Sequence, residues 1–325
     1  MKTINRNLIL SRASSRKIKR ICFSLLFVFI SLSTFGQNDY SWWDVKNNWV
    51  RGTHWHEYIT IAPGFMGPNA LPVPDIKNGL APKETTLKFA LEKHSSDGDE
   101  TENLFADLYI PLYSKKVGFR IYGVPFEQYK MDTLTRDKRS ARDYNGKGNS
   151  YGDVYFSTYI QLLEDHKFWP DFLLTLNFKT ASGNQLSAAR FTDAPAYFFD
   201  LSFGKTVAIK HDFFQSIRPH AMLGFFAWQT YEDNRRQNDA PVFGVGIDIN
   251  TPRVDISNAF GGYDGHNSFG DHALVYRLTV KSKFDSAFNY ELRLQNGFAD
   301  FEYTSFQLGC SINISKIKQE NKKSK

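Results

Sequence analysis

Charged side chains recur at alternate positions within hydrophobic stretches of this chain, where they could line a polar passage. Side chains two residues apart point to the same side of a β-strand. In a water-filled pore such charges select ions or solutes, whereas in a filled barrel they neutralise one another. Both signs of charge occur, so no strong ion selectivity is expected, and both interpretations stay open. The residues expected to face inward are Lys88, Glu92, Asp107, Arg120, Asp153, Tyr155, Lys179, Asp200, Asp248, Arg277, Lys281, Glu291 and Arg293.

A second candidate for chemistry lies in the glycine-rich stretch 261–271. His266 and Ser268 resemble the His-x-Ser pair of outer-membrane phospholipases and lipid A deacylases. A serine nucleophile needs a base within hydrogen-bond reach and a third group that orients the base. No orienting group stands at a matching spacing, and Gly, Asp, Asn and Ser are also usual in exposed loops. A lipid hydrolase is therefore an alternative function, and no catalytic residue is assigned.

Metal and cofactor chemistry finds little support. His54 and His56 would share one face of a strand, but two ligands without a third make a weak metal site. Cys22 lies in the N-terminal leader, which leaves Cys310 alone in the rest of the chain, so no disulfide is expected. We predict no metal and no cofactor.

The net charge of +6 is concentrated at the two ends of the sequence. Residues 1–36 contain seven basic and no acidic side chains, and residues 316–325 are rich in lysine. The part between them is acidic overall, so nucleic acid is not an expected partner.

Stretches of alternating hydrophobic and polar residues are the elements that would position the charges. For example, Tyr290 and Leu292 share one face of such a stretch, whereas Glu291 and Arg293 share the other. Most stretches reach the roughly 9–11 residues that a tilted membrane strand needs. We predict strands at 85–94, 103–113, 116–129, 151–164, 171–181, 196–207, 217–230, 241–250, 252–259, 272–284, 287–297 and 303–315.

The connections between these strands alternate in length. Outer-membrane barrels have short periplasmic turns and longer external loops. Alternation therefore predicts an even number of strands, with both ends of the barrel in the periplasm. Keeping one face hydrophobic across the turn at 285–287 also predicts that Lys281 lies opposite Glu291. The short links are 114–115, 164–169, 211–215, 250–251 and 285–287, and the longer ones are 95–102, 130–150, 182–195, 232–240, 257–271 and 297–302.

Three segments lie outside the predicted barrel at 85–315. Residues 1–36 have the basic start, the short hydrophobic core and the small residues Thr34 and Gly36 of a signal peptide cleaved before Gln37. A candidate strand at 57–62 is followed by residues 63–74, which are too rich in proline for a central strand. We therefore assign residues 37–84 to a segment before the barrel, either a periplasmic cap or a lumen plug. Residues 316–325 form a basic C-terminal tail.

One stretch of the chain resembles a known family. A strand that opens with Gly152-Asp153 is followed by Pro170 and by a strand that ends near Gly183. This order resembles the outer-membrane barrels linked to meta-pathway degradation of phenol and other aromatic compounds, although Thr180 to Gly183 replace the family's usual proline. The match covers about 150–205. The end of the leader is similar to that of Bacteroidetes exported proteins. The resemblance implies a channel-like outer-membrane barrel.

We therefore predict an all-β fold, a transmembrane antiparallel up-and-down β-barrel of about 12 strands (range about 10–14). A soluble β-sandwich is the alternative, but its strands average only about 5–6 residues. The expected function is an outer-membrane channel or transporter that passes small solutes through a polar lumen. A lipid hydrolase and a non-conducting structural barrel are the alternatives. Expected partners are outer-membrane lipids, a small-molecule solute and the barrel-assembly machinery of a Gram-negative cell.

Overall fold

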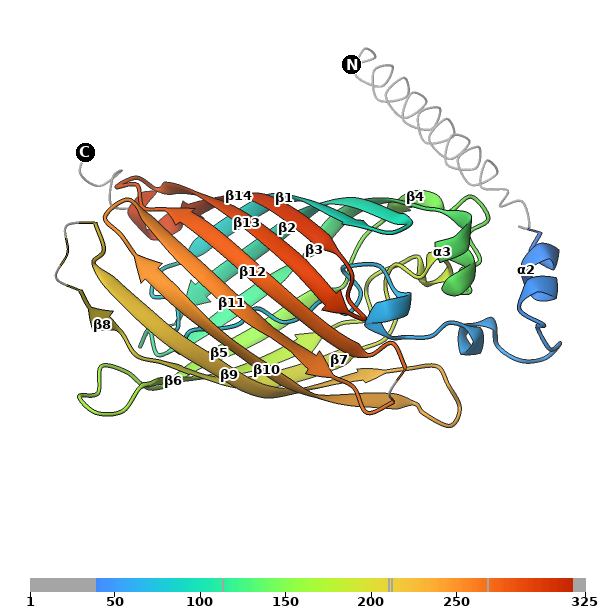
Figure 1. Ribbon diagram of the computed structural model, residues 1–325, viewed down its shortest axis with the longest axis horizontal. Coiled ribbons are helices and arrows are strands. Elements are labelled where there is room, and N and C mark those ends of the chain that lie inside the picture. Colours follow the sequence, from blue (N-terminus) through green and yellow to red (C-terminus); the bar gives the residue numbers. More distant parts are fainter. Residues whose placement is uncertain (1–38, 113, 210, 212, 268, 318–325) are drawn as a thin grey trace, which may run out of the picture. The chain divides into compact units, whose positions relative to one another are not determined.

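Twelve long strands close into an antiparallel barrel (Figure 1). The structure, a computed structural model, describes residues 39–112, 114–209, 211, 213–267 and 269–317. Each barrel strand pairs with the next, and the last pairs with the first from Thr86↔Asn313 to Ser95↔Thr304. The predicted up-and-down barrel is thereby confirmed. The strands are β1 Thr86–Ser96, β2 Asp99–Pro111, β3 Val117–Met131, β5 Val154–Leu163, β6 Asp171–Lys179, β7 Ala196–Gly204, β9 Ser216–Gln229, β10 Gln237–Asn250, β11 Val254–Asp264, β12 His272–Ser282, β13 Phe288–Ala299 and β14 Thr304–Asn313.

The remaining elements are short. Residues 39–45 belong to a separate unit from residues 46–325, and the barrel lies within the second unit. In the described part of the chain, no helix has the length and hydrophobicity needed to cross a membrane. Two short strands pair with barrel strands: β4 Lys147–Ser150 with β3, and β8 Val207–Ala208 with β9. The α-helices are α2 Ser41–Lys46 and α3 Thr133–Lys138. The 3-10 helices are η1 Trp55–Tyr58, η2 Pro63–Phe65 and η3 Leu186–Ala188.

The two ends of the barrel differ in their connections. One end, here the short-turn end, carries the links that precede β3, β6, β9, β11 and β13, together with both termini of the barrel. The other, the loop end, carries the long links 132–153 and 180–195. In outer-membrane barrels the short turns face the periplasm. By that rule the short-turn end would face the periplasm and the loop end the outside.

Several strands continue further toward the loop end than predicted. The expected long links 95–102 and 297–302 shrink to tight turns at 97–98 and 300–303, and β11 extends to Asp264. Gly98 has φ +80°, which suits its turn position. The polar residues that suggested loops belong to the strand ends, where Glu100 and Glu102 face solvent and Asp99 and Thr101 are buried. The β12–β13 register confirms that Lys281 lies opposite Glu291.

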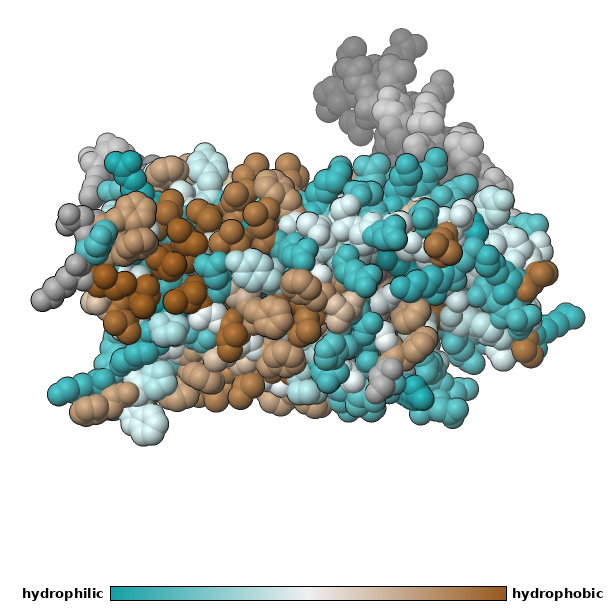
Figure 2. Space-filling view, in the orientation of Figure 1, coloured by the Kyte–Doolittle hydropathy of each residue, from teal (hydrophilic) through white to brown (hydrophobic). Residues whose placement is uncertain are grey.

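Hydrophobic side chains cover only part of the outer surface. In Figure 2 they gather on the part of the barrel nearer β8, whereas hydrophilic side chains cover the part near α3 and β4. Leu91, with 66% exposure, and Leu223, with 60%, belong to this belt. Lipid-facing positions of a membrane barrel are apolar. We call the belted half at the short-turn end the membrane half and the half at the loop end the projecting half.

The interior has the opposite polarity. In the projecting half, Phe226, Trp228 and Tyr263 form a buried hydrophobic core. In the membrane half, inward positions are polar. Along β12 the residues on the inward side change from Ala273 and Val275 to Arg277, Thr279 and Lys281. One strand therefore contributes to a hydrophobic core at one end and to a polar lumen at the other.

Candidate functional site in the barrel lumen

Residues 59–84, here the lumen segment, run inside the barrel from the loop end to the short-turn end. Near the loop end, Gly64 N donates to Gly270 O at 2.8 Å. Further in, Tyr263 Oη donates to the carbonyl of Leu71 at 2.7 Å. Near the short-turn end, the side chain of Gln161 accepts from Ala81 N at 2.7 Å. The segment then joins β1, which returns along the wall.

The preceding residues lie at the loop end of the barrel. Lys46 forms an ion pair with Asp137, which belongs to α3. The ring of His56 contacts that of Tyr231 in the link between β9 and β10. This is the mouth opposite to the one expected for a periplasmic cap.

Prolines explain why the lumen segment is extended and unpaired. Pro68, Pro72, Pro74 and Pro82 lack a backbone N–H and have a fixed φ, so they do not suit a helix or a central strand. Buried backbone carbonyls that are not paired within a β-sheet need other hydrogen-bond donors. Arg277 of β12 provides them, donating to Val73 O at 2.5 Å and to Pro74 O at 2.7 Å. Side chains of the wall thereby hold the backbone of the segment.

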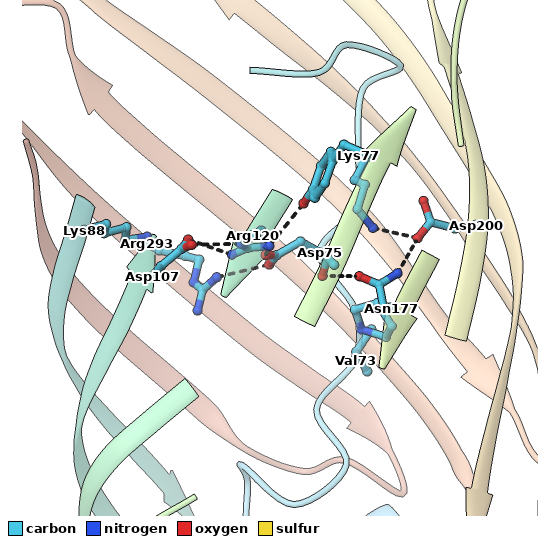
Figure 3. Close-up of polar contacts among 12 residues, drawn as sticks. Val73, Asp75, Lys77, Lys88, Asp107, Arg120, Asn177, Asp200 and Arg293 are labelled. Atoms are coloured by element: carbon cyan, nitrogen blue, oxygen red, sulfur yellow. Dashed lines mark hydrogen bonds and ion pairs between the residues drawn. The ribbon is translucent and has the colours of Figure 1, made fainter. Parts of the chain in front are cut away.

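Asp75 of the lumen segment meets three arginines from three strands. Figure 3 labels two of them, Arg120 and Arg293, beside Asp75. Its carboxylate oxygens lie 3.3 Å from Arg293 Nη1, 3.5 Å from Arg120 Nη1 and 3.8 Å from Arg277 Nη1. These arginines come from β13, β3 and β12, which surround the lumen. We call Asp75 and its three arginines the arginine cluster.

Wall residues hold each arginine of the cluster in place. Arg120 makes two bonds to Asp107, at 3.0 and 2.8 Å, and stacks over Tyr122 with 4.2 Å to the ring centroid. Arg293 bonds Glu92 at 3.1 Å, and Arg277 bonds the amide oxygen of Gln295 at 2.6 Å. Bidentate carboxylate contacts fix a guanidinium in direction as well as in position. The cluster is therefore oriented by the wall and completed by the lumen segment.

A second group of polar contacts lies closer to the short-turn end. Lys77 forms an ion pair with Asp200 at 2.6 Å, and Asn78 donates to Asp248 at 2.7 Å. Lys77, Asn78 and Asp248 line a cavity of about 600 Å³, which also reaches Lys281. The lumen of the membrane half is thus polar and partly open around the segment.

The projecting half contains a buried ionic cluster that the sequence analysis missed. Arg190, from the link 180–195, donates to Glu127 at 2.8 Å and to Asp99 at 2.7 Å, and its side chain is fully buried. Burial disfavours the charged guanidinium, but the carboxylates outweigh burial and raise the pKa of Arg190 above its usual value. Arg139 also donates to Asp99, at 2.6 Å. Arg190 lies in a loop, so no alternation of hydrophobic and polar residues indicated that it would be a buried charge.

The residues expected to line the lumen fall into three groups. Lys88, Glu92, Asp107, Arg120, Arg277, Glu291 and Arg293 lie in or beside the arginine cluster, where Lys88 pairs with Glu291. Asp200, Asp248 and Lys281 lie at or near the second group of contacts. Asp153, Tyr155 and Lys179 lie nearer the loop end, where Lys179 and Asp153 form a fully buried pair at 2.6 Å. Sequence reasoning did not find Asp75, Lys77, Asn78 or Arg190.

The alternative sites look different in the structure. His266 is exposed, and its Nδ1 accepts a hydrogen bond from Asp239 N at 3.0 Å, while Ser268 lies outside the described residues. Asp271 accepts from Asn238 and from two backbone groups of the same loop, which gives the loop a structural role. His54 precedes η1 as its N-cap and His56 lies within η1, so the two do not have the strand spacing that the metal-site alternative assumed.

Comparison with known proteins supports the fold. No family model and no curated protein matches the sequence. The solved structure of an outer membrane channel from Pseudomonas putida F1 matches with a TM-score of 0.50 and 9% identity, covering 74% of this chain and 99% of that one. The transport unit of the autotransporter AIDA-I from Escherichia coli has a TM-score of 0.45 and 8% identity, covering 75% and 94%. The KdgM porin in complex with disordered oligogalacturonate has a TM-score of 0.40 and 10% identity, covering 69% and 98%. At a TM-score of 0.50, the match to the Pseudomonas putida F1 structure shows that this chain shares its barrel fold.

Proposed function

We propose that this protein is an outer-membrane channel for small solutes that is closed at rest by its own lumen segment. The observation that carries the proposal is the polarity of the membrane half, where Asp75, Lys77 and Asn78 bond charged wall residues beside an open cavity of about 600 Å³. A barrel with only a structural role could pair its wall charges with one another. Here some charged residues of the wall, such as Arg293 and Asp200, are paired with the lumen segment, which could move out of the barrel.

Opening a continuous path requires movement of the whole lumen segment. In the projecting half, Ile59, Met66 and Leu71 are part of the hydrophobic core and leave little space beside them. Hydrophobic burial contributes about 25 cal/mol per Å² of apolar surface, so this packing is the larger obstacle. Ionic contacts in the membrane half would exchange with water and solute more easily. We therefore place the barrier to opening in the projecting half.

Single-channel conductance in planar bilayers tests the proposal. The chain of residues 37–325 should be silent or open only briefly, and deletion of residues 46–84 should give steady ohmic steps. Leu71→Ala should raise the open probability about tenfold or more, because the lost packing stabilises only the closed state.

Two controls accompany this experiment. Lys93→Gln removes a charge on the outer surface and should leave the conductance unchanged. Heat-dependent migration in detergent gels would verify that each variant forms a barrel. A folded deletion variant that conducts no current would overturn the channel and leave the non-conducting structural barrel.

A further inference from the structure

We infer that the arginine cluster is a binding site for a small carboxylate solute, with the carboxylate of Asp75 occupying that site at rest. The inference rests on the proposed function, because it assumes that solutes enter the lumen. It also goes further, since it names the chemical class of the solute and a competition between the solute and the lumen segment.

The charge balance of the wall favours an anion at this position. Without Asp75, the cluster and its neighbours have one positive charge in excess, because four cations face three carboxylates. The cations are Lys88, Arg120, Arg277 and Arg293, and the carboxylates are Glu92, Asp107 and Glu291. A cation withdrawn from bulk water needs a compensating partner. Asp75 supplies that charge, and a free carboxylate could supply it equally well.

The contacts of Asp75 are those of an exchangeable occupant. Its three distances to guanidinium nitrogens are 3.3, 3.5 and 3.8 Å, whereas Lys77 and Asp200 are 2.6 Å apart. The side chain of Asp75 is 45% exposed within the lumen, against 1% for Asp200. A loosely held and accessible carboxylate can be replaced without first opening a buried pair.

Arg277 depends on the lumen segment more than the other arginines do. Arg120 and Arg293 each keep a wall carboxylate, Asp107 and Glu92, if the segment moves away. Among the described residues, Arg277 would keep the side-chain amide of Gln295 as its one partner and would lose two carbonyl acceptors and the carboxylate of Asp75. A guanidinium recognises a carboxylate through parallel N–H donors. Arg277 is therefore the residue on which binding of a free carboxylate should depend most.

The space beside the cluster indicates a solute with a short hydrocarbon body. A cavity of about 100 Å³ is lined by Asp75, Arg277 and Arg293 and also by several aromatic rings, including Phe105 and Phe226. The buried hydroxyl of Tyr155, which lines the same cavity, has no hydrogen-bond partner among the described residues. Aromatic walls suit an apolar group. Inorganic anions offer no such group.

Calorimetric titration of the detergent-solubilised chain of residues 37–325 tests the inference, with butyrate as probe. A tethered carboxylate competes at an effective concentration in the millimolar range. Asp75→Asn should therefore bind butyrate about tenfold more tightly than the unmodified chain. Adding Arg277→Gln should abolish the gain, whereas adding Arg277→Lys, which keeps the charge, should retain most of it. The surface variant Lys93→Gln should bind as the unmodified chain does.

Two further ligands separate the alternatives. Butyramide, which has the same body without the charge, should not bind, and sulfate should bind at least about tenfold more weakly than butyrate. Equal butyrate affinity with and without Asp75→Asn, or no effect of Arg277→Gln, would overturn the site. Sulfate binding as tight as butyrate binding would overturn its assignment to carboxylates.

The binding test is independent of the conductance test. Butyrate binding that depends on Arg277, together with a silent barrel after deletion of 46–84, would refute the channel and retain the ligand site. A conducting deletion variant together with no butyrate binding to Asp75→Asn would refute the ligand site and retain the channel.

Discussion

The two halves of this barrel use the same strands with opposite polarity. In the projecting half the outer surface is hydrophilic, as at Glu100 and Glu102, and the interior is a hydrophobic core, as in a soluble protein. In the membrane half, lipid-facing residues such as Leu91 are apolar and the interior is charged. The lumen segment passes through both environments, so its two parts are held by different forces.

This difference indicates how the segment is divided between anchoring and exchange. Burial of apolar side chains is favourable in proportion to area, whereas buried ion pairs roughly balance their desolvation cost. Residues 59–73 should therefore fix the segment in the barrel. Residues 74–84 should hold its position while remaining open to competition from ions and solutes.

The largest expected effect concerns the buried charge of the projecting half. Arg190→Met would leave Asp99 and Glu127 without their fully buried partner, and removal of one partner of a buried pair costs about 3–5 kcal/mol. Arg293→Met, in the more accessible membrane half, should cost less, because Arg293 is 21% exposed and water can solvate Asp75 and Glu92 in its place. Denaturant unfolding in detergent micelles would measure both. Equal losses would contradict the proposed difference between the halves.

A smaller effect is expected for truncation within the lumen segment itself. Leu71 is 1% exposed, and replacing it with alanine should cost about 3 kcal/mol, because the cavity is surrounded by packed side chains. Ile76 is only partly buried, so Ile76→Ala should lower the free energy of unfolding by about 1 kcal/mol. Unfolding of both variants under identical conditions gives the comparison. A larger loss at Ile76 would place the main anchor in the membrane half.

Salt should distinguish the two parts without any substitution. Raising the ionic strength from about 0.05 to 1 M shortens the Debye length to about 3 Å and weakens the exposed contacts of Asp75. Backbone amide exchange in residues 74–84 should accelerate a few-fold, while residues 59–73 keep their rates. Hydrogen exchange followed by mass spectrometry resolves the two peptides. Uniform acceleration would show that the segment moves as one unit.

Local alternation explains why the barrel could be predicted from the sequence. Residues such as Glu291 and Leu292 reveal their faces through their immediate neighbours, so the strands and the Lys281–Glu291 register followed directly. The polar ends of β1, β2 and β13 were mistaken for loops, because the prediction assumed that strands end at the membrane surface. In the structure they continue into solvent.

The contents of the lumen were harder to predict, because they depend on contacts between distant residues. Asp75 reaches Arg293 across more than two hundred positions, and no local pattern links them. One signal was present in the sequence. The hydrophobic run from Ala221 to Trp228 leaves no polar face on that part of β9, as expected where a strand covers a hydrophobic core rather than a polar lumen.

The smallest effect is expected where the lumen segment leaves the barrel at the short-turn end. Lys83 pairs with Glu164 at 2.6 Å, but the two side chains are 39% and 24% exposed. Solvent-exposed pairs contribute about 0.2–1 kcal/mol, because water screens the charges and two long side chains lose freedom. Lys83→Gln should therefore change the free energy of unfolding by no more than about 0.5 kcal/mol and leave the conductance unaltered. If this substitution instead opened the channel, the rim would set the barrier, and the hydrophobic packing of residues 59–73 would not be what keeps the lumen closed.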